Sequence, residues 1–247
     1  MIDDRRSLLF AALGSLAACA ALAMPDAEQA ARSIVEQTNL LRRSAGIAAV
    51  AADPQLTATA RQFSAFMAKS DRYAHDADGR QPAERAAAQG YDFCLVAENI
   101  AYQYSTAVFD TNELASRFER GWENSPGHRR NMLDAEATQT GVALAQAPGS
   151  KRWYAVQMFG RPAALRMRFE IANRSQQPLV YTLGTVAHTL PPRVTRQHES
   201  CRVEALVMRL PGATQTTHVQ PRGGDSFVVE PLGAGGAANL GLRNLRR

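Results

Sequence analysis

Residues 122–133 read WENSPGHRRNML and place a bulky anchor, a helix start and an imidazole within one turn of each other. Pro126 suits the first position of a helix, and Ser125 can cap that helix. His128 then lies in the first turn, where the partial positive charge of the helix end disfavours the imidazolium. The segment is therefore either part of a site, with the ring free as an acceptor or metal ligand, or an ordinary capped helix with an exposed histidine.

The first 160 residues combine helical and strand patterns. Helices are expected over residues 25–43, from 53, over 82–89 and from 110, and strands over 96–104, 140–147 and 153–159. The clearest helical stripe, from Leu56 to Met67, belongs to a core. Pro148-Gly149-Ser150 separates the last two strands and predicts an antiparallel hairpin. Helices packed on a small antiparallel sheet give an α+β sandwich.

The pattern changes after Gly160-Arg161-Pro162. From Leu165 onward helical stripes vanish, and short apolar runs alternate with Pro, Gly, Asn and Thr clusters. The runs are residues 167–171, 179–183, 203–210 and 226–229. They predict a small all-β domain over residues 165–247, built as a sandwich or an open barrel. The Gly- and Ala-rich tail from Gly233 onward is expected to be flexible.

The first 23 residues are interpreted as an export signal. Arg5-Arg6 precedes an apolar run that is too short to span a membrane as a stable helix. Two processing routes stay open: cleavage after Ala23, and attachment of a diacylglyceryl group to Cys19, which ends a lipobox-like LAAC. The arginine pair also resembles a twin-arginine signal. The protein is expected to be exported to the periplasm or beyond, with membrane contact only through a lipid on Cys19.

Export leaves two cysteines in the mature chain, Cys94 and Cys201. In an oxidising compartment a lone pair is expected to be bridged, provided the fold brings the Cα atoms within about 7 Å. The bridge would tie the two domains together. It would close a loop of roughly 100 residues, worth about 4 kcal/mol in the chain-entropy model.

Composition and charge argue against nucleic acid as a partner. The chain is 45% hydrophobic and 21% charged, which is typical of a globular protein with a buried core. Its net charge of +5 comes almost wholly from arginine, because Lys69 and Lys151 are the only lysines. No basic run is interleaved with aromatic residues, so the charge predicts no nucleic-acid surface.

Three segments carry candidate chemistry: YAHDADGR at residues 73–80, AENIA at 97–101, and the segment 122–133. In this order and spacing they resemble the CAP superfamily of cysteine-rich secretory, antigen 5 and pathogenesis-related proteins, the SCP-like domain, in its bacterial form. Further segments that continue the resemblance are residues 39–42, 53–56 and 140–160. The resemblance covers roughly residues 30–162, within a domain assigned to 26–162, and leaves the C-terminal domain unmatched.

The resemblance implies an α-β-α sandwich with an open cleft lined by two histidines and two acidic residues. His75 and His128 match the two imidazoles. Glu98, in the Glu-Asn-Ile segment, matches one carboxylate. The fourth position is open between Glu123, which is the nearest candidate, and Glu119 or Glu113 earlier on the same helix.

Two imidazoles with one or two carboxylates suit a divalent metal such as zinc, with water completing the shell. They equally suit a histidine that a carboxylate orients without any metal. No HExxH motif is present and no serine lies in a GxSxG elbow, so the sequence identifies no nucleophile. A hydrolase would rely on metal-bound water with Glu98 or Glu123 as base. A site that binds without catalysis is the favoured interpretation.

The remaining histidines and the tryptophans are interpreted more simply. His188, His198 and His218 fall in the β domain without metal spacing, and we expect them to be solvent-facing or hydrogen-bonded. Trp122 and Trp153 are expected to be core anchors.

Three functions are compatible with these patterns. The favoured one is an exported binding module at the cell envelope, whose cleft holds a divalent cation, an envelope component or, since some CAP relatives bind sterols or other lipids, a small apolar ligand. The alternatives are a metal-assisted hydrolase that uses the same cleft and a lipid-anchored structural protein of the envelope.

Overall fold

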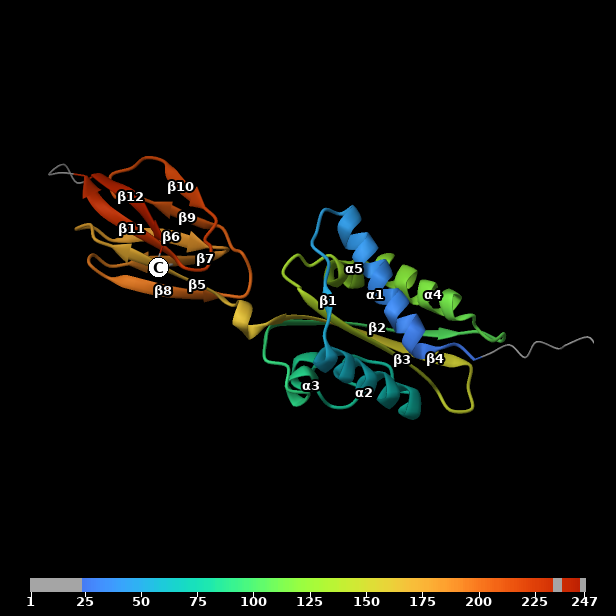
Figure 1. Cartoon of the computed structure of the whole chain (residues 1–247). Coiled ribbons are helices and arrows are strands. Elements are labelled where there is room, and N and C mark those ends of the chain that lie inside the picture. The colour runs from blue at the N-terminus through green and yellow to red at the C-terminus, as the bar shows by residue number, and fades with distance from the viewer. Residues whose placement is uncertain (1–23, 233–236, 245–247) are drawn as a thin grey trace, which may run out of the picture.

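The protein folds into two parts joined by a short connector, as Figure 1 shows. The computed structural model describes residues 24–232 and 237–244. The expected export signal and Cys19 lie outside the described residues. Within them, no helix is both long enough and apolar enough to cross a membrane.

The N-terminal domain is built on one four-stranded sheet. Its strands are β1 (Ala51–Ala52), β2 (Phe93–Tyr104), β3 (Gln139–Gln146) and β4 (Arg152–Pro162). The strand order is β1-β3-β4-β2. The short β1 runs parallel to β3, whereas the three long strands pair antiparallel. β2 is therefore an edge strand, and its outer side is open to partners from other segments.

Helices cover both faces of this sheet (Figure 1), which confirms the α-β-α sandwich. The helices on one face are α1 (Ala27–Ser44), α4 (Thr111–Glu123) and α5 (Pro126–Met132), and those on the other are α2 (Pro54–Ser70) and α3 (Pro82–Ala88). Trp122 and Trp153 are buried in the core of the first face, as predicted. Phe63 and Met67, from the predicted stripe, are buried in the core of the second.

Side-chain caps fix several helix starts. Asp26, Asp53 and Asp110 each accept two backbone N–H bonds from the first turn of α1, α2 and α4, as capping aspartates do. Ser125 stands at the cap position of α5, but its hydroxyl makes no cap hydrogen bond, so the expected side-chain cap is wrong. Pro126 begins that helix instead, because its fixed φ suits the first helical position.

One buried arginine ties α1 to the end of α5. Arg42 is fully buried. Its guanidinium donates to the carbonyls of Met132 (2.8 Å), Asp134 (2.9 Å) and Ala137 (3.0 Å). Burial lowers the pKa of Arg42, and the charge of Asp134 opposes that effect. Because α5 carries His128, this contact helps to position a predicted site residue.

The C-terminal domain is a sandwich of two sheets, which confirms the predicted all-β class. The 3₁₀ turn Ala163–Leu165 leads into it. Its strands are β5 (Met167–Asn173), β6 (Leu179–Leu183), β7 (Val186–Leu190), β8 (Thr195–Ser200), β9 (Leu206–Arg209), β10 (Thr216–Val219), β11 (Asp225–Leu232) and β12 (Ala237–Asn244). The sheet orders are β10-β9-β6-β7 and β12-β11-β5-β8. Phe169, Tyr181 and Phe227 lie in the core between the sheets.

Several strands of this domain differ from the sequence expectation. β7, β8, β10 and β12 were absent from it, and β9 is shorter than the run 203–210. The tail expected to be flexible from Gly233 forms β12 over Ala237–Asn244, paired with β11. β12 alternates Ala238 and Leu240 with Asn239 and Gly241, but the glycine- and alanine-rich stretch before it favours a flexible tail. β8 and β10 are mostly polar and lack an apolar alternation. Backbone pairing with a neighbouring strand needs none.

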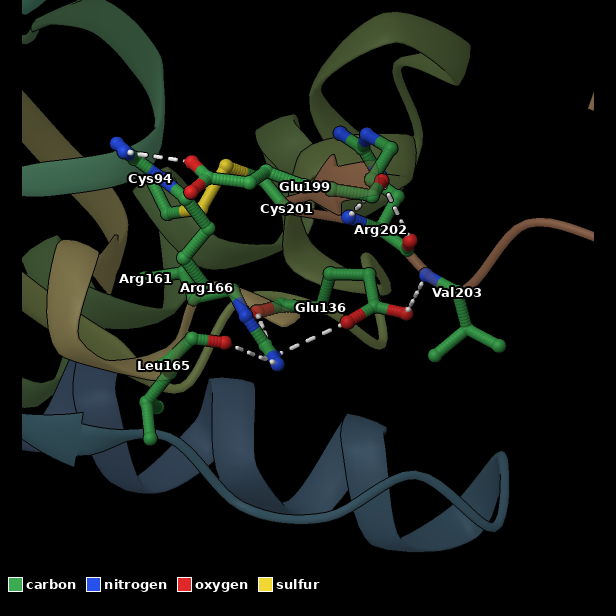
Figure 2. The surroundings of a disulfide bond; sticks show 10 residues. Cys94, Glu136, Arg161, Leu165, Arg166, Glu199, Cys201, Arg202 and Val203 are labelled. Carbon is green, nitrogen blue, oxygen red and sulfur yellow. Dashed lines mark hydrogen bonds and ion pairs between the residues drawn. A yellow bond between two sulfur atoms is a disulfide. The ribbon is translucent and has the colours of Figure 1, made fainter. Parts of the chain in front are cut away.

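The predicted disulfide is present and joins the two domains. Cys94 in β2 bonds to Cys201 just after β8, with the Cα atoms 5.3 Å apart and a separation of 107 positions in sequence. Figure 2 shows the bond at the junction of the two domains. The bridge therefore links the edge strand of the CAP-like sheet to the β sandwich.

Ion pairs reinforce the junction beside the disulfide (Figure 2). Arg202 reaches across to Asp134 at 2.8 Å. Glu136 pairs with Arg161 at 3.0 Å and accepts the backbone N–H of Val203, also at 3.0 Å. The side chains of Glu136 and Arg161 are each only 18% exposed, so this pair is less screened by water than a surface pair.

Candidate functional site

The candidate site lies along the free edge of β2. Asn131 of α5 donates to the Glu98 carbonyl over 3.2 Å. Tyr73 and Trp122 both donate to the Ile100 carbonyl, each over 3.1 Å. All three sequence segments with candidate chemistry thus meet at one strand edge. There, side chains hydrogen-bond to β2 carbonyls that would otherwise lack a partner, because no further strand pairs with this edge.

His75 and Glu98 form the centre of the site. His75 Nδ1 donates to Glu98 Oε1 over 2.8 Å. The Glu98 side chain is 1% exposed, whereas that of His75 is 51% exposed. Since Nδ1 donates to the carboxylate, Nε2 of the neutral ring is left as an acceptor on an exposed, oriented imidazole.

A buried arginine occupies the other side of Glu98. Arg85 Nη2 donates to Glu98 Oε2 and to the His75 carbonyl, both over 2.8 Å, and Nη1 donates to Asp78 Oδ1 over 2.7 Å. The guanidinium also lies over the Phe63 ring, 3.5 Å from its centroid. The Arg85 side chain is 1% exposed. Both oxygens of the Glu98 carboxylate are therefore engaged, one by an imidazole and one by a buried cation.

Sequence reasoning missed Arg85. The residue lies in the seven-residue helix α3, which is too short and too rich in alanine for a stripe to reveal which side chain turns inward. The charge of Glu98 could have indicated such a partner, because a buried carboxylate requires a nearby cation or a proton. The sequence between residues 72 and 98 holds three arginines, Arg72, Arg80 and Arg85, and only the fold shows that Arg85 is the partner.

His128 approaches the same edge from α5. Burial first, and the neighbouring His75 second, lower the pKa of His128. The direction agrees with the sequence expectation, and burial and His75 are causes that the sequence did not reveal. Its Nδ1 is buried and has no hydrogen-bond partner within the described residues. Asn99 fixes the backbone nearby by donating to the His128 carbonyl over 3.2 Å.

No acidic residue of α4 completes the site. The side chain of Glu123 forms no hydrogen bond or ion pair in the described part of the chain, and the residue borders a surface hollow with Arg129 and Arg130. Glu113 pairs with Arg117 on the helix surface at 2.8 Å. Glu119 is buried, and burial first and Glu123 second raise its pKa. None of the three is hydrogen-bonded to either imidazole.

These residues do not fit the metal site that two histidines and two carboxylates would form. Across residues 24–232 and 237–244, no group of three or more His, Cys, Asp and Glu side chains could hold a metal ion. Glu98 already serves His75 and Arg85, which leaves two imidazoles as donors. Structural zinc sites use four protein ligands and catalytic ones use three. The donor set is therefore too small for either kind.

The sequence signature of the cysteine-rich secretory protein family, CAP, matches residues 35–159, just over half of the chain. The chain belongs to the CAP family. The match begins within α1 and ends within β4, so the CAP domain carries the whole edge-strand site. The β sandwich lies outside the match.

Several solved structures are similar to this chain. An extracellular protein containing an SCP domain from Bacillus anthracis is 26% identical, with a TM-score of 0.45 over 55% of this chain and 41% of that chain. An outer surface protein from Borrelia burgdorferi is 18% identical, with a TM-score of 0.49 over 56% and 96%. NaASP2 with Zn²⁺ is 18% identical, with a TM-score of 0.42 over 56% and 84%. No curated protein matches the chain.

The sandwich outside the CAP domain holds a second pair of histidines. His198 Nε2 lies 2.8 Å from the Tyr181 hydroxyl. The ring centroid of His188 lies 5.3 Å from that of His198 and 5.0 Å from that of Tyr181. His218 stands apart on β10, where it contacts the Thr216 hydroxyl. The sequence expectation of hydrogen-bonded histidines describes His198 well, but it did not foresee that two of them meet.

Acidification is expected to destabilise the β sandwich through His198. Burial first, then the charges of His188 and Arg196, lower the pKa of His198 from 6.5. The unfolded chain therefore binds a proton more readily than the folded chain. The stability is present above about pH 6.5 and is lost as the pH falls through the lower folded pKa. The melting temperature should fall between about pH 7.5 and about pH 5.

The variant His198→Gln separates this contribution from that of His128, which has the same sign. Glutamine keeps a polar group near Tyr181 but does not titrate. Its melting temperature should depend less steeply on pH than that of the wild type. An unchanged slope in the variant would show that His198 does not govern the effect.

Proposed function

We propose that this chain is an exported protein of the cell envelope whose CAP domain binds a ligand at the β2 edge, between His75 and His128. The formed disulfide supports an oxidising compartment. The family is described as secretory. The proposal is thus a binding module and not an enzyme.

The fixed orientation of His75 carries this proposal. Glu98 and Arg85 are both buried, and taking two charges out of water is unfavourable unless their geometry and hydrogen bonds compensate. As a result, the His75 imidazole is exposed but is held in one orientation by the bond from its Nδ1 to Glu98. Rigid presentation of a polar group on a strand edge is what a binding site requires.

The chemistry of the two rings favours a ligand that donates hydrogen bonds. The lowered pKa of His128 keeps its ring neutral at pH 7, so the ring can accept a hydrogen bond. Nε2 of His75 is also an acceptor in the neutral ring. Hydroxyl groups of an envelope glycan match two acceptors on an open edge. A cation held by carboxylate and imidazole together has less support, because Arg85 already pairs with Glu98.

The two alternative functions have less support. A hydrolase would use Glu98 or Glu123 as base, but the oxygens of Glu98 accept from His75 and Arg85, and Glu123 is not hydrogen-bonded to an imidazole. A lipid-anchored structural role depends on Cys19, which lies outside the described residues.

The binding proposal is tested by titrating the protein with soluble peptidoglycan fragments while the histidine ring protons are followed by NMR. The wild type should show saturable shifts at His75 and His128. His75→Ala and His128→Ala should each weaken binding by about tenfold, as loss of a hydrogen bond of about 1.4 kcal/mol would. The matched control is His218→Ala, which should bind as the wild type does. Binding that survives both cleft variants would refute the proposal.

A zinc titration distinguishes this assignment from a metal site. Two imidazoles should give at most weak binding, with no complex at about 10 µM Zn²⁺. A zinc complex that forms at that concentration and disappears in His128→Ala would instead establish the metal site.

A small apolar ligand is a second candidate, at a different place. An open groove of about 360 Å³ lies between α1, α2 and β3, with an apolar floor that includes Ala31, Val35 and Leu144 and with charged residues on its lining, Glu28, Arg32, Glu36 and Arg61. This size and lining suit a single acyl chain. Palmitate binding measured by calorimetry should be saturable in the wild type and lost in Ala31→Trp, which would fill the groove. An unaffected Ala31→Trp variant would exclude this site.

A further inference from the structure

One end of the CAP domain gathers the ends of several helices and strands and one turn. Figure 1 shows that α1 begins at this end, and that α2, β2 and the turn between β3 and β4 reach it as well. Contacts join these segments: the Asp26 N–H donates to Thr111 Oγ1 over 3.0 Å, and Lys151 in the turn donates to the Thr106 carbonyl. The described chain also begins here, at Met24.

This end carries a concentration of exposed apolar side chains. Of the eleven large hydrophobic side chains exposed among the described residues, five lie in β2 or in the loops next to the ends of α1, α2 and α4. They are Met24, Tyr73, Tyr102, Tyr104 and Val108, and together they are called here the tyrosine face. The rings of Tyr73 and Tyr102 pack edge to face, 5.1 Å apart. Exposed apolar side chains that gather in this way mark an interaction surface.

Cationic side chains border the tyrosine face. Both lysines of the chain lie here, Lys69 at the end of α2 and Lys151 in the β3–β4 turn. Arg72 follows Lys69, and neither forms an ion pair within the described ranges. The acidic residues at this end are engaged. Asp71 is paired with Arg152, Glu28 with Arg61 and Glu113 with Arg117, and Asp26 and Asp110 cap helices.

We propose that the tyrosine face docks on an anionic phospholipid bilayer. Tyrosine rings favour the headgroup region, where the ring is buried and the hydroxyl stays hydrated. Lysine and arginine near the surface are attracted to anionic lipids.

The N-terminal apolar segment leads directly into this end of the domain. From a lipid on Cys19 to Met24 the chain spans at most about 18 Å, so a membrane-attached N-terminus would bring this face, rather than the β sandwich, to the bilayer.

The proposal does not rest on His75 or His128, although Tyr73 lies in the tyrosine face and also contacts the β2 edge, and it is tested without the N-terminal segment. The chain beginning at Met24, the form left by cleavage after Ala23, contains every described residue, and its fold is verified by thermal unfolding. It is sedimented with vesicles of phosphatidylglycerol and phosphatidylcholine in about equal parts and with phosphatidylcholine alone. We expect binding to the anionic vesicles that weakens with added salt.

Two variants separate the apolar and the charged contributions. Tyr104→Ser removes the most exposed ring and should weaken binding about tenfold, since binding scales with buried apolar area. Lys69→Gln with Lys151→Gln should weaken binding to anionic vesicles by about fivefold for each lysine. The matched control is Val180→Ser with Val186→Ser, which removes two side chains exposed by 52% and 57% in the β sandwich and should leave binding unchanged.

Three outcomes would overturn the proposal. The first is equal binding to the anionic and the neutral vesicles. The second is a loss in the valine control as large as that in Tyr104→Ser. The third is no vesicle binding together with capture on purified envelope glycan that Tyr104→Ser abolishes, which would assign the tyrosine face to a sugar polymer. Each leaves the His75 and His128 titration unaffected.

Discussion

An Arg85→Met chain is expected to be less stable than the wild type by about 3–5 kcal/mol in the free energy of unfolding. Methionine keeps much of the volume but removes the cation that faces Glu98 Oε2 at 2.8 Å. It also removes the donors to the His75 carbonyl and to Asp78. A carboxylate left buried without its partner retains its desolvation cost, which is why the effect is large. Urea unfolding at neutral pH measures it.

Two further variants show whether the buried pair is responsible. Arg80→Met changes the same residue type on the exposed loop before α3 and should alter stability by less than about 0.5 kcal/mol. Adding Glu98→Gln to Arg85→Met removes the unpaired charge, so the double variant should recover part of the lost stability. If the two substitutions were simply additive, the explanation through an uncompensated carboxylate would fail.

The Arg85→Met substitution is also expected to change the candidate site. Arg85 does not face a ligand but holds the Glu98 carboxylate that orients His75. Even in the fraction that stays folded, Arg85→Met should therefore move the NMR signals of the His75 ring. Those of His218 on β10 should stay in place, because that residue lies in the other domain.

Replacing Cys94 and Cys201 together by serine is expected to lower the free energy of unfolding by about 4 kcal/mol. The bond closes a loop of 107 residues, and the entropy that such a loop removes from the unfolded chain sets this magnitude. The Arg202–Asp134 pair and the hydrogen bond from Val203 to Glu136 would still bridge the domains, but Arg202 is 53% exposed, and a pair with an exposed partner contributes little. Guanidinium unfolding of the double variant checks the value.

The wild type under reducing conditions is the control for this prediction. Its unfolding should match that of the Cys94→Ser, Cys201→Ser variant, because both lack the cross-link and differ only in sulfur and oxygen atoms. A loss below about 1 kcal/mol in both would mean that the unfolded chain is not constrained by the loop as the entropy argument requires.

Much of the fold could be predicted because its patterns are local. The stripe from Leu56 to Met67 and the cap at Asp110 each lie within a few residues, and both are found where the sequence placed them. Strand β8 could not be predicted, since it is mostly polar and is specified by pairing with β5 rather than by its own hydrophobic alternation. β12 does alternate Ala238 and Leu240 with polar or small residues, but the glycine-rich stretch before it favours a flexible tail, and only the pairing with β11 shows that it is a strand.

By itself, the sequence determined the α+β class of the first domain, the all-β class of the second and the pair Cys94–Cys201, because periodicity and cysteine number require no knowledge of distant contacts. It also placed His75, Glu98 and His128 in one candidate cleft. Only the tertiary structure decided that Arg85 faces Glu98 and that Glu123 does not join the site. The physical reason is that the partner of a buried charge depends on how loops and helices fold back on a strand edge. The residues next to that charge in sequence do not determine which distant side chain reaches it.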